Sequence, residues 1–275
     1  MGDDGKVAVS VVICCADAAA TLPAAIASAR EWAAEVVVVD SGSSDDTAAI
    51  ARAAADVYRL EPWRGYTAQK RFGTTLARHD WVLVLDGDEE VSPTLAGQVR
   101  DWLSGPNTDT VDVVHVKRRN WVLGRRVRAW DPDWQSRLVH RGRAVWRDEA
   151  LHDGLEPGSP RRMARLSGHL EHKRAGPAAW SDYFCGRRLD DRLMLVAEQM
   201  HARGRRASWL DLWLRPRLAF WKFYLLKRGF LSGTFGLMIA QKAALSVQLK
   251  YAALWALQQA GGPADAVLDT PRGGV

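Results

Sequence analysis

Three continuous apolar runs rich in β-branched residues constrain the fold of this chain most strongly. They are Lys6–Cys15 (KVAVSVVICC), Glu35–Asp40 (EVVVVD) and Asp80–Asp86 (DWVLVLD). Runs without polar alternation are typical of strands that are buried on both faces of a parallel sheet. Helical patterns separate them, and Asp56–Leu60 fits a further short strand. This alternation predicts a doubly wound α/β unit with a mostly parallel, Rossmann-like sheet.

Acidic residues close each of these three strands. Asp17 follows the first, Asp40 ends the second, and Asp86 and Asp88 close the last. In an open α/β sheet, ligands bind beyond the carboxyl ends of the strands, which share one rim. Clustered carboxylates repel one another unless a cation or hydrogen-bond donors compensate them. We therefore expect Asp86 and Asp88 to hold Mg²⁺ or Mn²⁺, which prefer oxygen ligands and share substrate phosphates. A solvated turn is the alternative for the Asp-Gly-Asp tripeptide taken alone.

The order and spacing of three segments carry a family resemblance. SVVICCAD, VVVVDSGSSDDT and WVLVLDGDEEVSP together resemble family 2 glycosyltransferases of the GT-A fold. The segments DPDWQSRLVHRGRAVW, EALHDGL and RPRLAFWKFYLLKRGFLSGTFGLMIA extend the similarity to inner-core lipopolysaccharide glucosyltransferases. The resemblance implies a GT-A-type doubly wound sheet with a C-terminal helical extension.

The resemblance also implies an activity. We expect a metal-dependent, inverting hexosyltransferase that moves a sugar from a UDP-linked nucleotide-sugar donor to a lipid-linked saccharide acceptor. Its pathway would be lipopolysaccharide or cell-envelope glycan biosynthesis. Many relatives carry a second acid directly after the residue that matches Asp40, whereas this chain has Ser41. The residues expected to bind the nucleotide sugar are Asp17, Asp40, Ser41, Gln69, Lys70, Arg71, Asp86 and Arg137. Apart from the resemblance, an inward-facing Arg137 in DWQSRLVHR would hold a donor phosphate through two hydrogen bonds; the alternative is one more charge on a basic face.

Glycosyl transfer also needs a base that removes the proton of the acceptor hydroxyl. His152-Asp153 matches a His-Glu pair of the lipopolysaccharide subgroup, so Asp153 is the first candidate. Asp148 and Glu149 are alternatives, because they lie close by in the same segment. His152 would be a third metal ligand, would orient the base, or would be a surface histidine.

Charge and composition divide the chain. Residues 1–110 hold 9 Lys and Arg against 17 Asp and Glu, whereas residues 111–275 hold 29 against 15. Between Asp211 and Asp265 there is no acid, and Trp and Phe alternate with Lys and Arg, a composition typical of interfacial membrane helices. We expect a catalytic, nucleotide-sugar-binding domain over 1–175, a helical membrane-associating region over 176–260 and a flexible tail over 261–275. A helical subdomain with a solvated basic face is the alternative.

The three cysteines show no disulfide or metal-type spacing, which favours a reducing compartment. Neither a signal-peptide pattern nor an apolar stretch of about 20 residues is present in the sequence. We expect a cytoplasmic protein, peripheral on the inner face of the cytoplasmic membrane, whose partners include an anionic lipid surface. Nucleic acid is not an expected partner, because the strand-end acids would repel phosphate. The alternative function is a metal-dependent phosphotransferase or phosphatase that uses Asp86 and Asp88.

Overall fold

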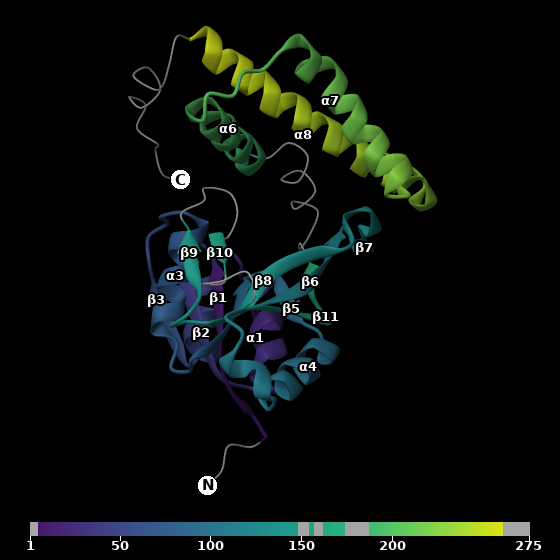
Figure 1. Cartoon of the computed structure of the whole chain (residues 1–275). Helices are drawn as coiled ribbons and strands as arrows, with labels where there is room; N and C mark the ends of the chain where they lie inside the picture. Colours follow the sequence, from purple (N-terminus) through teal and green to yellow (C-terminus); the bar gives the residue numbers. More distant parts are fainter. Residues whose placement is uncertain (1–4, 148–153, 157–161, 174–186, 261–275) are drawn as a thin grey trace. The chain divides into compact units, whose positions relative to one another are not determined.

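The computed structural model describes residues 5–147, 154–156, 162–173 and 187–260. The chain divides into two compact units, Met1–Trp180 and Ser181–Val275, which Figure 1 shows as a sheet-based unit and a set of helices. Each unit is described by itself below.

A mixed sheet forms the centre of the first unit. In its described part, the strands are β1 (Val7–Cys15), β2 (Ala33–Asp40), β3 (Val57–Leu60), β4 (Trp81–Asp86), β5 (Glu89–Val91), β6 (Val113–Val122), β7 (Arg125–Arg126), β8 (Asp133–His140) and β11 (Met163–Lys173). Their order is β3-β2-β1-β4-β8-β6-β11-β5, and β7 pairs with β6. The first four are parallel, β8 runs against both of its neighbours, and β6 and β11 are again parallel to each other. β9 (Val145–Arg147) and β10 (Gly154–Glu156) form a separate ribbon.

Helices cover both faces of this sheet. α1 (Leu22–Arg30), α2 (Thr47–Ala54) and α4 (Pro93–Leu103) pack on the face to which Val11 and Ile13 belong. α3 (Tyr66–Leu76) packs on the opposite face, with Val12. Side chains alternate between the two faces along a strand, so burial on both sides requires β1 to be apolar at nearly every position; the exception, Ser10, is buried and donates to Glu35 Oε2. The predicted doubly wound α/β fold is confirmed.

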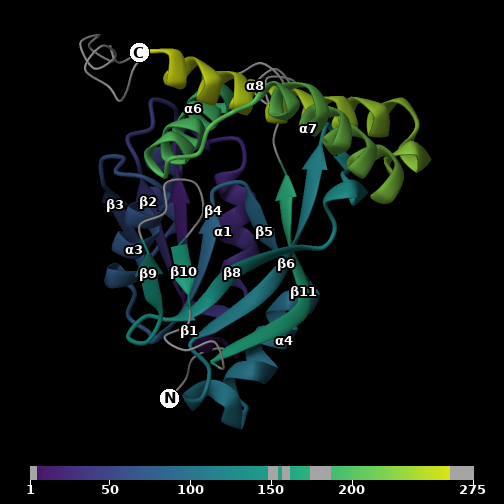
Figure 2. The same ribbon diagram turned by 45° about the horizontal axis from the view of Figure 1, so that its top comes forward.

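The second unit is helical. It contains α6 (Arg187–Ala202), α7 (Trp209–Trp221) and α8 (Thr234–Gln259), and both α6 and α7 contact α8; Figures 1 and 2 show α7 running beside α8. A π-helical turn (Lys222–Leu226) and a 3₁₀ turn (Gly229–Ser232) connect α7 to α8. The predicted C-terminal helical extension is thus confirmed. Among the described helices, none combines the length and the hydropathy that a membrane span requires.

Candidate active site

The carboxyl ends of β1, β2 and β4 bring two of the predicted acids, Asp40 and Asp86, to the same rim of the sheet. In the sheet register, Cys14 of β1 is paired with Asp86 of β4, and Cys15 is paired with Asp40 of β2. Since neighbouring positions of a strand face opposite ways, the two carboxylates project from opposite faces of the same rim. They therefore belong to two different networks.

On one face of the sheet, Asp17 and Asp40 accept hydrogen bonds from the loop that follows β2. The Asp40 side chain is buried and accepts hydrogen bonds from Ser43 Oγ (2.6 Å) and Tyr58 OH (3.1 Å). Asp17 Oδ1 accepts from the Ser44 backbone N–H at 2.9 Å. Asp17 adopts a left-handed backbone conformation (φ 49°), which Asp tolerates better than most residues. These bonds fix the loop, whereas the nucleotide-binding roles of Asp17, Asp40 and the half-buried Ser41 stay predictions.

On the other face, Asp86 lies between two buried cations. Lys70 Nζ, from α3, is 2.7 Å from Asp86 Oδ1, and an Arg137 guanidinium nitrogen, from β8, is 2.7 Å from Asp86 Oδ2. Burial favours the neutral carboxyl, but the charges of Arg137 and Lys70 outweigh it and hold the pKa of Asp86 well below its ordinary value. Asp86 is therefore an anion whose charge the protein itself compensates. The phosphate-binding roles of Lys70 and Arg137 stay predictions.

The network continues through a buried acid that the sequence interpretation did not include. The Glu89 side chain is fully buried, and its Oε1 lies 2.7 Å from Arg137 and 3.4 Å from Arg118. Its Oε2 accepts the backbone N–H of Asp86 at 3.1 Å. Arg118 in turn donates through Nε to Asp133 Oδ2 at 2.9 Å. Glu89 thus binds the backbone of Asp86 and also orients the Arg137 side chain.

Asp88 faces a histidine that the sequence interpretation also missed. His172, near the end of β11, places Nε2 3.1 Å from Asp88 Oδ2 and Nδ1 2.7 Å from Asn120 Oδ1. The Asn120 amide nitrogen donates to Asp133 Oδ2 at 2.9 Å. This bond assigns the amide orientation, so the oxygen of Asn120 has to accept a hydrogen bond from Nδ1 of His172.

The tautomer of His172 follows from that bond. With a proton on Nδ1, Nε2 is the nitrogen that faces the Asp88 carboxylate, at 3.1 Å. If Nε2 also carries a proton, the two groups form an ion pair, and if it does not, they offer one nitrogen and one oxygen ligand to a cation. One nitrogen and one oxygen ligand, completed by substrate phosphates, fit a divalent metal. Among the described residues there is no group of three His, Cys, Asp or Glu side chains arranged to hold a metal.

Gly87 allows the turn between the two acids to lie against β1. A Cβ at this position would be 2.7 Å from Cys15 Cβ and 3.1 Å from Ala18 Cβ. The Gly87 backbone N–H also donates to the Cys14 carbonyl oxygen at 3.0 Å. A larger residue would push the Asp-Gly-Asp turn away from the sheet.

The other predicted site residues lie in three kinds of place: buried, exposed, or outside the described part of the chain. The Gln69 side chain is buried, and its amide donates to the Glu61 carbonyl oxygen at 2.8 Å, while Arg71 is exposed. The candidate bases and their neighbouring histidine lie outside the described residues, and their roles stay predictions: Asp148, Glu149, His152 and Asp153.

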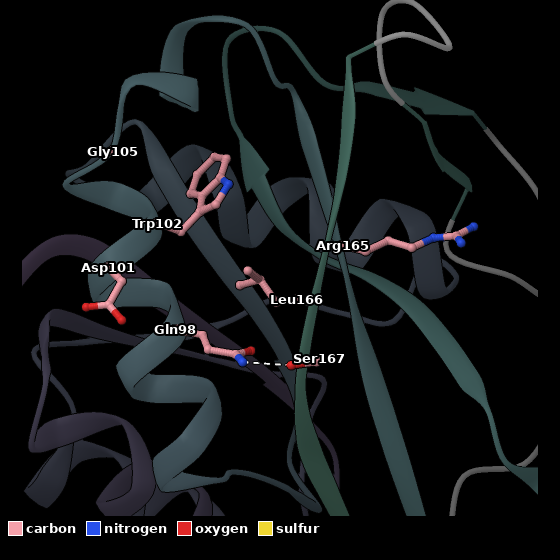
Figure 3. Close-up of a pocket in the computed structure, with 7 residues that line it drawn as sticks. All are labelled: Gln98, Asp101, Trp102, Gly105, Arg165, Leu166 and Ser167. Carbon is pink, nitrogen blue, oxygen red and sulfur yellow. Dashed lines mark hydrogen bonds between the residues drawn. The ribbon is translucent and has the colours of Figure 1, made fainter.

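A hollow of about 440 Å³ lies elsewhere on the first unit, between α4 and β11. Figure 3 shows Trp102 and Leu166 on its apolar side, the Gln98 amide bonded to Ser167 (2.7 Å), and Arg165 pointing away across β11. None of the rim residues lines it, so this hollow is separate from the candidate site.

The family model of glycosyl transferase family 2 matches residues 10–166, which is more than half of the chain and contains Asp17, Asp40, Asp86, Asp88 and Arg137. This chain belongs to glycosyl transferase family 2. In this family 2 protein, the segment that matches the family model begins in β1, extends into β11 and includes both acids of the Asp-Gly-Asp turn.

Similar proteins include two from Rhizobium meliloti. The lipopolysaccharide core biosynthesis glycosyltransferase LpsC is 29% identical over 230 residues, which are 80% of this chain and 81% of LpsC. The succinoglycan biosynthesis protein ExoU is 39% identical over 99 residues, 33% of this chain and 29% of ExoU. An uncharacterized glycosyltransferase of Rickettsia bellii is 36% identical over 109 residues, 40% of this chain. The match spans only 37% of that protein.

A crystal structure of S. aureus TarS 1-349 in complex with UDP-GlcNAc is also similar, with a TM-score of 0.45, 15% identity and 93% of each chain covered.

Proposed function

We propose that this family 2 glycosyltransferase moves a sugar from a UDP-linked nucleotide sugar to a lipid-linked saccharide, with inversion and with Mg²⁺ or Mn²⁺. The observation that carries the proposal is the pair of Asp88 and His172, 3.1 Å apart at the rim of a sheet that the family model covers. The names of LpsC and ExoU support a role in lipopolysaccharide or other cell-envelope glycan biosynthesis.

The metal would be held by Asp88, with His172 as an added ligand, and Asp86 stays the other predicted ligand. When bound, it stabilises the charge of the leaving diphosphate as a Lewis acid. Asn120 fixes the metal-binding tautomer of His172 through its 2.7 Å bond to Nδ1. Lys70 and Arg137 keep Asp86 ionised beside this position and bring positive charge toward the donor phosphates.

The remaining roles are assigned as follows. Asp17, Asp40 and Ser41 border the loop proposed to receive the nucleoside, with Gln69 and Arg71 at the ribose and phosphates. Asp153 is the proposed base that takes the acceptor proton, and Asp148 or Glu149 is the alternative. We assign catalysis to residues 1–175 and membrane association to 176–260; the predicted tail, residues 261–275, lies outside the described residues. The protein would work on the cytoplasmic face of the inner membrane, where its lipid-linked acceptor lies.

Asp88→Asn and His172→Ala test the proposal, with Asp101→Asn on the exposed side of α4 as the control. In wild-type protein, UDP is expected to raise the melting temperature only when Mn²⁺ or Mg²⁺ is present, because a ligand that binds the folded state stabilises it. Both site variants should lose this metal-dependent increase and the release of UDP from UDP-sugars, whereas the control keeps both. Normal sugar transfer by Asp88→Asn would refute the metal assignment.

Assays on the same purified protein distinguish glycosyl transfer from the alternative function. Release of inorganic phosphate from phosphomonoesters, without cleavage of any UDP-sugar, would favour a phosphotransferase or phosphatase. The family match argues against that outcome.

A further inference from the structure

The bend between α7 and α8 exposes a concentrated apolar surface. We call it the hairpin end, and it consists of Trp221, Leu225, Leu226, Phe230 and Leu231, whose exposed fractions are 51%, 50%, 80%, 46% and 71%. Along α7, the exposed residues Leu210, Leu214 and Leu218 lead toward it at four-residue spacing, which places them on one side of the helix. Contiguous apolar surfaces of this kind mark sites of interaction.

The backbone of the bend is closely packed. A Cβ at Gly236, in the first turn of α8, would lie 1.8 Å from the Gly229 carbonyl oxygen, so the two segments approach backbone to backbone. Tyr224 stacks on Phe220 (ring centroids 5.3 Å apart) and meets the edge of Phe230 (6.4 Å). The apolar side chains of the hairpin end therefore project from a fixed turn.

Exposed cations are interspersed with these apolar residues along the chain. They are Arg217, Lys222 and Arg228, and the sequence contains no acid between Asp211 and Asp265. The surface therefore fits a partner that is apolar in the middle and anionic at its edge. An anionic lipid bilayer has both properties, whereas a second copy of the same surface would bring like charges together.

We propose that the hairpin end inserts into the acyl region of an anionic bilayer, while Arg217, Lys222 and Arg228 bind the lipid headgroups. Insertion deepens the proposed function and rests on it, since it would hold the enzyme at the membrane that carries its lipid-linked acceptor. Phe220, Trp221 and Tyr224 lie at the base of the hairpin end, and aromatic rings of this kind favour the headgroup level.

The test uses the full chain and two matched double variants. Leu226→Ser/Leu231→Ser removes the two most exposed residues of the hairpin end, and Leu245→Ser/Leu249→Ser removes two exposed leucines (41% and 37%) from the middle of α8. Binding to vesicles of phosphatidylcholine with or without phosphatidylglycerol is measured by flotation. Wild type and the α8 variant should bind the anionic vesicles alike, and the hairpin-end variant should bind at least about tenfold more weakly. An environment-sensitive fluorophore on Leu226→Cys should shift to the blue with anionic vesicles, and one on Gln248→Cys should not.

Insertion by the hairpin end would be overturned if both double variants bound anionic vesicles as well as the wild type does. It would also be overturned if both double variants lost this binding to the same extent. Self-association of the wild type without lipid, abolished by Leu226→Ser/Leu231→Ser, would make the hairpin end a contact between copies of the chain. Cleavage of UDP-sugars in solution is followed in parallel. If wild-type protein binds vesicles but does not cleave UDP-sugars, only the proposed function is contradicted. If it cleaves UDP-sugars but does not bind vesicles, only the insertion is contradicted.

Discussion

Glu89 and Glu90 are adjacent residues of one type in very different environments, so they form a matched pair for substitution. The Glu89 side chain is fully buried and lies 2.7 Å from Arg137, which is 1% exposed. Glu90 is 26% exposed and lies 2.7 Å from Lys173, which is 51% exposed. The two ion pairs have the same length, but Glu89 is buried and also contacts Arg118 and the Asp86 backbone N–H. Glu89→Gln and Glu90→Gln each remove one charge with little change in shape.

Burial sets the expected size of the two effects. Removing one partner of a buried ion pair costs about 3–5 kcal/mol, because the other charge stays buried without compensation. An exposed pair contributes about 0–1 kcal/mol. Glutamine can still accept a hydrogen bond from Arg137, and Asp86 also contacts this arginine, so about 3 kcal/mol is expected for Glu89→Gln. At about 2–4 °C per kcal/mol, Glu89→Gln should lower the melting temperature by about 6–12 °C and Glu90→Gln by less than about 4 °C.

Thermal unfolding at pH 7, followed by far-ultraviolet circular dichroism in the same buffer, measures the melting temperatures of both variants and the wild type. Urea titration gives their free energies of unfolding. The reasoning is refuted if Glu89→Gln melts within about 2 °C of the wild type, or if Glu90→Gln melts as low as Glu89→Gln. Either result would mean that the Asp86, Arg137 and Glu89 network stabilises the fold no more than a solvated pair does.

Three further predictions concern the base, pH and the hairpin bend. Asp153→Asn should lower kcat by about a hundred- to ten-thousandfold with donor affinity unchanged; if Asp148→Asn or Glu149→Gln does so instead, the base is one of them. The lowered pKa of Asp86 means that its stabilising contribution persists at neutral pH and disappears only as pH falls through the folded-state pKa. The stability difference between wild type and Asp86→Asn should therefore stay constant from about pH 7 to 5 and shrink below about pH 4 in urea titrations, whereas shrinkage above pH 5 contradicts this. Gly236→Ala should destabilise the helical unit by about 1–3 kcal/mol in thermal melts, and Gly97→Ala, where a Cβ meets no atom within 4 Å, should not.

The sequence predicted the first half of the sheet well, because β1, β2 and β4 are buried on both faces and are therefore apolar at nearly every position. It did not predict β5 or α4. β5 has only three residues, Glu89–Val91, too few for a periodic pattern. The start of α4 did carry a signal, because Ser92 caps it by accepting the Leu95 backbone N–H at 3.2 Å and Pro93 occupies its first turn.

The candidate site was predictable only where it depends on strand ends. Asp86 ends an apolar strand, the family resemblance pointed to Lys70, and Arg137 was proposed as an inward-facing arginine in DWQSRLVHR. Glu89 and His172 were missed because their roles depend on which strands become neighbours. β11 pairs with β6 on one side and with β5 on the other, which places His172 in register with both Asn120 and Glu89. No local pattern in the chain encodes that order, although a histidine at the end of a strand was a usable signal.

The two acids of the Asp-Gly-Asp turn are not equivalent. Among the described residues, Asp86 has its charge compensated by two fixed cations, Lys70 and Arg137, at 2.7 Å each. Asp88 lies 3.1 Å from Nε2 of His172, whose Nδ1 donates to Asn120 at 2.7 Å. Loss of the Asp86 charge would remove a carboxylate from the buried Lys70 and leave Arg137 paired with Glu89, which is a cost to folding. Loss of the Asp88 charge would remove one of the proposed metal ligands with little cost to folding, so Asp88→Asn should keep the melting temperature that Asp86→Asn lowers.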